Sequence, residues 1–135
     1  KAFDSVNHSI LIKKLDCLGV RGCINNWFES YLSGRKQTTE IDGYISQKEI
    51  NSFGVPQGSV LGPLLFLLFI NDINKASNIL NFFIFADDTT LLYAHKNLKK
   101  LEATMNNELQ KLNNWLSANK LTLNIKKSNF VLFRP

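Results

Sequence analysis

The chain has 135 residues, of which 44% are hydrophobic and 20% charged, and its formal net charge is +5. This length fits one domain or part of one, and the composition is too apolar for an intrinsically disordered chain. Two cysteines are too few for the disulfide framework of a small secreted protein, so we expect Cys17 and Cys23 to be free, buried thiols in a reducing compartment. The longest apolar run, residues 60–70, is shorter than the roughly 17–25 residues of a membrane span and is predicted to be core.

Charge is distributed unevenly along the chain. Residues 1–95 carry 8 basic and 9 acidic side chains, whereas residues 96–135 carry 8 basic and 2 acidic ones. A basic segment after a neutral body indicates a polyanionic partner, but a solvated, lysine-rich helix face has the same composition. The charge pattern alone leaves both interpretations open. The chain starts at Lys1 with strand-like sequence directly after it, so we expect it to be cut from a longer polypeptide.

Two helices are predicted near the start of the chain. Apolar residues at helical spacing place the first at about residues 10–18, with Asn7 or Ser9 as its N-cap and Gly19 as its stop. The same pattern recurs at about residues 24–32. We therefore expect two consecutive amphipathic helices.

A hairpin, a turn and a buried helix are predicted next. In residues 35–49, apolar and polar residues alternate as in β-strands on both sides of Asp42-Gly43, and this dipeptide is a strong hairpin signal. A glycine-rich turn at residues 54–58 then leads into an apolar helix at about residues 63–73, with proline near its start.

The second half of the chain is predicted to contain another hairpin and a long helix. Residues 82–85 and 91–93 are two apolar, strand-like arms joined by residues 86–90. A single apolar stripe with charged residues on the other face predicts a long amphipathic helix over about residues 98–116.

The last elements complete the predicted fold class. Residues 121–124 and 130–133 are predicted to be short strands. Helices that interleave with hairpins favour an α+β fold, in which an antiparallel sheet has helices packed on one face.

The pair Asp87-Asp88 is the first candidate for chemistry. Two adjacent carboxylates repel each other, and apolar arms on both sides penalise their charged forms. A divalent cation would relieve both penalties, and Mg²⁺ suits oxygen ligands of this kind. The alternative is a solvated hairpin tip, since Asp is a common turn residue.

Two other turns are candidates for ligand contact. In residues 54–59, Gly58 lets the backbone approach a ligand closely, and Gln57 offers a donor and an acceptor to a sugar or base. The alternative is a plain turn before a buried helix. Near the end of the chain, Lys126 or Lys127 could neutralise a phosphate or donate a proton to a leaving group, or could simply be exposed.

Four sequence blocks occur in a fixed order. They are Lys-Ala-Phe-Asp-Ser-Val-Asn-His at 1–8, Gly-Val-Pro-Gln-Gly-Ser-Val-Leu-Gly-Pro at 54–63, Phe-Ala-Asp-Asp at 85–88 and Asn-Ile-Lys-Lys-Ser at 124–128. This ordered set resembles the palm region of reverse transcriptases of non-LTR (LINE-type) retrotransposons, over nearly the whole chain. Alternatives are a group II intron maturase-type or bacterial retroelement reverse transcriptase, and a non-catalytic RNA-binding module.

The resemblance implies an RNA-directed DNA polymerase that works by two-metal nucleotidyl transfer on a polymerase palm. Asp87 matches the metal-binding carboxylate of the family, with Asp88 as its neighbour, and the implied cofactor is Mg²⁺ or Mn²⁺. Gln57 and Gly58 match positions that contact the incoming nucleotide and the template. Lys127 matches a lysine that assists the pyrophosphate leaving group, with Lys126 as the other choice.

The role of each residue in the first block depends on how the block is aligned with the family's first motif. In the resembled family it follows the pattern Asp-x-x-Lys-Ala-Phe-Asp, whose metal ligand is the leading Asp, and this places that ligand before Lys1. Phe3 then takes the position of a ring that would collide with a ribose 2′-hydroxyl and so favour deoxynucleotides. In this register Asp4 is expected to be a structural acid near Asn7 and His8.

The resemblance also implies a context for the chain. Residues 1–135 are expected to be a palm fragment that starts inside the first catalytic motif, lacks most of the fingers and the thumb, and is inactive by itself. The implied partners are template RNA, a DNA primer, deoxynucleoside triphosphates and the remaining parts of the parent polyprotein, without a membrane. Location is expected to be nuclear or cytoplasmic, not secreted.

Overall fold

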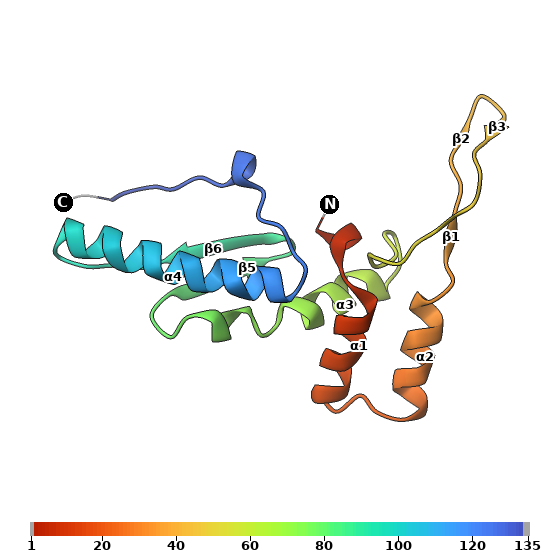
Figure 1. Ribbon diagram of the computed structural model, residues 1–135, viewed down its shortest axis with the longest axis horizontal. Helices are drawn as coiled ribbons and strands as arrows, with labels where there is room; N and C mark the ends of the chain where they lie inside the picture. The colour runs from red at the N-terminus through yellow and green to blue at the C-terminus, as the bar shows by residue number, and fades with distance from the viewer. Residues whose placement is uncertain (1, 134–135) are drawn as a thin grey trace.

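The computed structural model describes residues 2–133, which form a mixture of helices and short antiparallel strands (Figure 1). The α+β class predicted from the sequence is confirmed at this level. Lys1 of the first sequence block and residues 134–135 of the basic segment lie outside the described residues. Among residues 2–133, no helix is both long and apolar enough to cross a bilayer.

The N-terminal helices form as predicted. A short 3₁₀ helix, η1 (Phe3–Ser5), precedes α1 (His8–Cys17). Asn7 caps α1, because its Oδ1 accepts a hydrogen bond from the backbone N–H of Ile10 at 3.0 Å. α2 (Cys23–Leu32) follows and packs beside α1 (Figure 1).

The two cysteines are free, as expected, but both are exposed, so the prediction that they are buried is wrong. Cys17 is the last residue of α1 and Cys23 the first of α2, where the chain turns at the surface. The buried stripe of α1 contains Leu11 and Leu15, which are one helical turn apart. Cys17 lies two residues after Leu15 and therefore on the other side of the helix.

A narrow arm follows α2 and projects from the rest of the chain (Figure 1). It consists of two antiparallel strand pairs: β1 (Lys36–Gln37) with β4 (Glu49–Ile50), and β2 (Glu40–Ile41) with β3 (Tyr44–Ile45). Asp42 and Gly43 form its turn, which confirms the predicted hairpin.

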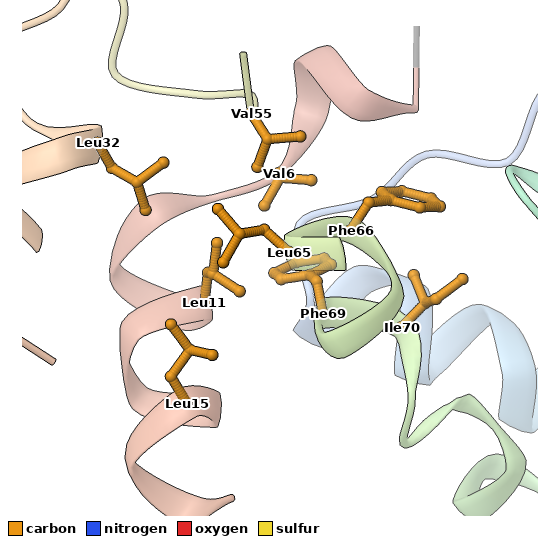
Figure 2. Packing of buried hydrophobic residues seen from close by; sticks show 9 residues of the cluster. All are labelled: Val6, Leu11, Leu15, Leu32, Val55, Leu65, Phe66, Phe69 and Ile70. Atoms are coloured by element: carbon orange, nitrogen blue, oxygen red, sulfur yellow. The ribbon is translucent and has the colours of Figure 1, made fainter. Parts of the chain in front are cut away.

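The core is centred on α3 (Leu61–Ile70), which packs against α1. Figure 2 shows the buried side chains that meet there: Val6, Leu11, Leu15, Leu32, Val55, Leu65, Phe66, Phe69 and Ile70. α3 begins two residues before the predicted Pro63, because a proline in the first helical turn lacks only an N–H that has no intrahelical partner. It ends at Ile70, and Ile73 belongs to the separate 3₁₀ helix η2 (Ile73–Ala76).

The second hairpin is confirmed, with a tighter connection than predicted. β5 (Asn81–Phe85) pairs with β6 (Asp88–Leu92), and Phe85 lies opposite Asp88. The turn therefore contains only Ala86 and Asp87.

The predicted long helix is α4 (Leu98–Ala118), and it packs against η2. Its cap is Asn97, whose Oδ1 accepts from the N–H of Lys100 at 3.0 Å. Glu108 on α4 is buried, and one of its carboxylate oxygens accepts from Lys111 Nζ at 2.6 Å.

The predicted strands at 121–124 and 130–133 are wrong, because this part of the described chain contains only the 3₁₀ helix η3 (Ile125–Lys127). A strand is stable only when a neighbour satisfies its backbone groups, and neither segment is paired here. Phe130 accordingly stays 91% exposed. Residues 2–133 therefore contain three separate two-stranded sheets in place of the expected single sheet.

Candidate functional site

Two of the sequence blocks are docked against each other, although about 50 residues separate them in the chain. Hydrogen bonds of Gly54 and Val55 join them: from Gly54 N to Val6 O (2.8 Å), from Val55 N to Phe3 O (2.9 Å) and from His8 Nε2 to Gly54 O (2.7 Å). Val6 and Val55 are both buried in the core (Figure 2). The turn that follows Phe53 is thus held firmly on the segment 3–8.

Gly54 is the residue that makes this docking possible. Its φ of +85° is in the region that favours glycine, and a Cβ built on it would lie 2.9 Å from Asp4 Cα and 3.0 Å from Asp4 O. Those two atoms are backbone and cannot turn aside. Only glycine allows the turn to lie this close to η1.

The rest of the turn is held by its own side chains. Ser59 Oγ donates to Pro56 O at 2.8 Å and accepts from Gly62 N at 2.9 Å, so it ties the turn to the start of α3. Gly58 has a φ of +78°, and a Cβ built on it would meet nothing within 4 Å. The positive φ favours glycine at this position, and the open space beside Gly58 is compatible with the predicted close approach of a ligand.

A cavity of about 840 Å³ lies beside the docked turn. Its polar lining comes from η1, the base of the arm and the turn, and consists of Asp4, Arg35, Gln37, Asn51, Ser52 and Gln57. Gln57 Nε2 donates to Asp4 Oδ1 at 2.6 Å, and Asn51 Nδ2 donates to Gln37 Oε1 at 2.9 Å. The volume and the polar groups suit a ligand of small-molecule size.

Arg35 is the basic residue of this lining, and it was not among the residues predicted from the sequence. The hairpin signal at Asp42-Gly43 could have found it, because hairpin pairing brings residue 35 opposite residues 50–51, just before the turn. The structure has this arrangement: Asn51 N donates to Arg35 O at 2.8 Å. Arg35 can form a bidentate bond to a phosphate, which makes the cavity suitable for an anion.

Phe3 does not belong to the cavity lining. Its ring lies on Phe66 of α3, with 4.5 Å between ring centroids and 31° between planes, and it packs against the core. Phe3 thereby supports the segment on which the turn is docked. Its role as a nucleotide gate stays a prediction.

Asp87 lies in the turn of the β5–β6 hairpin and Asp88 is the first residue of β6, and both are exposed. The turn is at the right-hand end of the hairpin in the view of Figure 1. Within residues 2–133, no group of three or more His, Cys, Asp or Glu side chains could by itself hold a metal ion. Mg²⁺ is often bound by only one or two carboxylates together with substrate phosphates. A cation held by Asp87 and Asp88 would therefore take its other ligands from substrate or water.

Lys126 and Lys127 lie in η3 and are exposed. The backbone N–H of Lys127 donates to Asn124 O at 3.0 Å, and Ser128 Oγ donates to the same carbonyl at 2.9 Å. The lysines are thus presented on a short, ordered turn. Neither lines the cavity.

Comparison with known proteins agrees with the family that the sequence blocks resemble. Residues 1–133 match the family described as "Reverse transcriptase (RNA-dependent DNA polymerase)". The "Probable RNA-directed DNA polymerase from transposon X-element" of Drosophila melanogaster is 31% identical over 109 residues. The "RNA-directed DNA polymerase from mobile element jockey" of the same species is 29% identical over 112 residues. Each alignment covers 78% of this chain and 12% of the relative, so the chain spans about an eighth of their length.

Proposed function

The chain belongs to the reverse transcriptase (RNA-dependent DNA polymerase) family, as its sequence blocks predicted, and we propose that it is a palm fragment of a non-LTR (LINE-type) retrotransposon polymerase. Relatives from mobile elements favour this over a maturase-type or bacterial enzyme and over a non-catalytic RNA-binding module. The observation that carries the proposal is that two motif blocks are docked against each other and together line one polar cavity.

The cavity is proposed to bind the incoming deoxynucleoside triphosphate. Arg35 would bond phosphate oxygens, since a guanidinium matches them in both charge and geometry. Gln57 would contact the sugar or base through its amide. Gly58 follows Gln57 just outside the cavity lining and would allow the ligand to approach the backbone there. Template RNA and a DNA primer are the proposed polymeric partners, with the other parts of the parent polyprotein completing their binding site.

Asp87 and Asp88 would hold Mg²⁺ or Mn²⁺ at the tip of the β5–β6 hairpin. The bound cation would stabilise charge on the transferring phosphates and lower the pKa of the primer hydroxyl. Both residues are exposed, Asp87 in the turn and Asp88 at the start of β6, so the remaining ligands of the cation can come from substrate. Lys127 is proposed to assist the pyrophosphate leaving group.

Nucleotide binding by this chain tests the cavity. We expect calorimetric titration with a deoxynucleoside triphosphate to show saturable binding that Arg35→Ala weakens about tenfold or more, as for a lost charged hydrogen bond. Lys36→Ala is the matched control, because it removes the same charge one residue further on, outside the cavity lining. Equal losses from both substitutions, or no binding by the unsubstituted chain, would contradict the proposal.

Cation binding tests the hairpin separately. We expect electron paramagnetic resonance to detect Mn²⁺ bound by the chain, with affinity reduced at least fivefold by Asp87→Asn because one of two carboxylate ligands is lost. Asp42→Asn is the control, since Asp42 occupies the turn of the other hairpin without a neighbouring carboxylate. Binding that responds to Asp42 and not to Asp87 would place the cation elsewhere.

A further inference from the structure

Asp4 has a partner in the structure that its sequence context did not indicate. Its Oδ1 accepts a hydrogen bond from Gln57 Nε2 at 2.6 Å, across 53 residues, and both side chains line the cavity. We propose that Asp4 is a positioning residue, which fixes the orientation of the Gln57 amide for the ligand. This inference rests on the proposed nucleotide-binding role of the cavity.

The chemistry of the pair determines which end of the amide is available. A glutamine amide has a carbonyl oxygen at one end and an NH₂ group at the other, and it can rotate to exchange them. An ionised carboxylate only accepts hydrogen bonds, so Asp4 selects the orientation with Nε2 toward itself. Gln57 Oε1 is then the end not bonded to Asp4, and it would accept from a hydroxyl or amino group of the ligand.

The backbone holds Asp4 at a constant position relative to Gln57. Residues on both sides of Asp4 take part in the docking, since Phe3 O accepts from Val55 N and Val6 O accepts from Gly54 N. Gly54 also lies against the Asp4 backbone itself. Gln57 is otherwise a flexible side chain on an exposed turn, so the bond to Asp4 selects its rotamer before the ligand arrives.

The geometry of the pair can be measured without any ligand. We expect NMR of the free chain to show slowed hydrogen exchange for the Gln57 side-chain NH₂, lost in Asp4→Ala and kept in Asp4→Asn, whose Oδ1 can still accept. Glu40→Ala is the control, because it removes an exposed acid of the arm outside the cavity lining. Gln57 signals that are the same in Asp4→Ala as in the unsubstituted chain would overturn the inference.

Nucleotide affinity supplies the second measurement. We expect Asp4→Ala to weaken binding of a deoxynucleoside triphosphate about tenfold, equal to about 1.4 kcal/mol, and Asp4→Asn to restore most of it. In a Gln57→Ala background, Asp4→Ala should have no further effect, since its effect acts through Gln57. Additive losses would show that Asp4 acts by another route and would overturn the inference.

The two measurements separate the possible failures. If the unsubstituted chain binds no nucleotide, the proposed function fails while the NMR result still decides the pairing. If Asp4→Ala does not fold, a pair of variants that exchanges the amide and the carboxylate supplies the test. Gln57→Glu alone places two carboxylates together and should lose nucleotide binding. Adding Asp4→Asn should restore it, because the asparagine NH₂ can donate to the glutamate. Failure of that restoration would overturn the inference.

Discussion

Replacement of Gly54 by alanine is the sharpest test of the docked turn. The substitution has two costs: the strain of alanine at positive φ, and the clash of its Cβ with the Asp4 backbone at 2.9 Å. Strain of this kind costs about 1–2 kcal/mol, and an overpacked contact adds about 1–3 kcal/mol. We therefore expect Gly54→Ala to reduce the free energy of unfolding by about 2–5 kcal/mol.

Gly58→Ala is the matched control, because Gly58 has nearly the same φ, +78°, and nothing lies within 4 Å of the position that a Cβ would take there. It should cost only the strain, about 1–2 kcal/mol. Urea unfolding, followed by tryptophan fluorescence and circular dichroism, would measure both values. Equal losses for the two variants would refute the conclusion that the turn is docked on the Asp4 backbone.

Two further predictions concern the helices behind the site. Lys14→Met removes the ion pair of Lys14 Nζ with Asp72 Oδ1 (2.5 Å) and should lower the free energy of unfolding by about 1–3 kcal/mol. Arg21→Met is the control, because it removes an exposed ion pair, and it should lower the free energy of unfolding by less than about 0.5 kcal/mol. The hydrogen bond from Lys111 holds the pKa of Glu108 below its ordinary value of 4.5, against the opposing effect of burial. Because the folded-state pKa is the lower one, this stabilisation is complete above pH 4.5 and is lost as the pH falls through the folded-state pKa. Glu108→Gln should therefore flatten the dependence of urea stability on pH in that range, and an unchanged slope would contradict the assignment.

Local signals in the sequence were sufficient for most helices and for both hairpins. The cap at Asn7, the turn at Asp42-Gly43 and the apolar stripe of α4 each depend on neighbours within a few residues. Such patterns predict structure without knowledge of the rest of the chain. The strands expected at 121–124 and 130–133 failed because strand formation depends on a partner, and an alternating or apolar run does not say whether one is present.

The candidate site was only partly predictable for the same reason. Gln57 and Gly58 were predicted from the local pattern of a glycine-rich turn; the structure has this turn, with Gln57 in the cavity lining and Gly58 outside it. Arg35 and the bond from Gln57 to Asp4 depend on contacts between segments far apart in sequence. Asp4 was expected to interact with residues close to it in the chain, whereas its carboxylate accepts a hydrogen bond from Gln57 of the other motif block.

One side chain of α1 connects two other helices of the fold, α3 and α4. Lys14 of α1 donates to Phe69 O at 2.6 Å at the end of α3 and pairs with Asp72, and its Nζ lies 4.8 Å and 4.9 Å from the ring centroids of Phe69 and Trp115. Trp115 belongs to α4, so a single ammonium group on α1 contacts both α3 and α4. It is only 17% exposed, which strengthens its interactions with both the carboxylate and the rings. If the cavity and the hairpin act on one substrate, Lys14→Met should loosen their relative placement and weaken nucleotide binding in the presence of Mn²⁺ more than in its absence. Equal weakening in both conditions would show that the effect of Lys14 on nucleotide binding does not depend on the cation site.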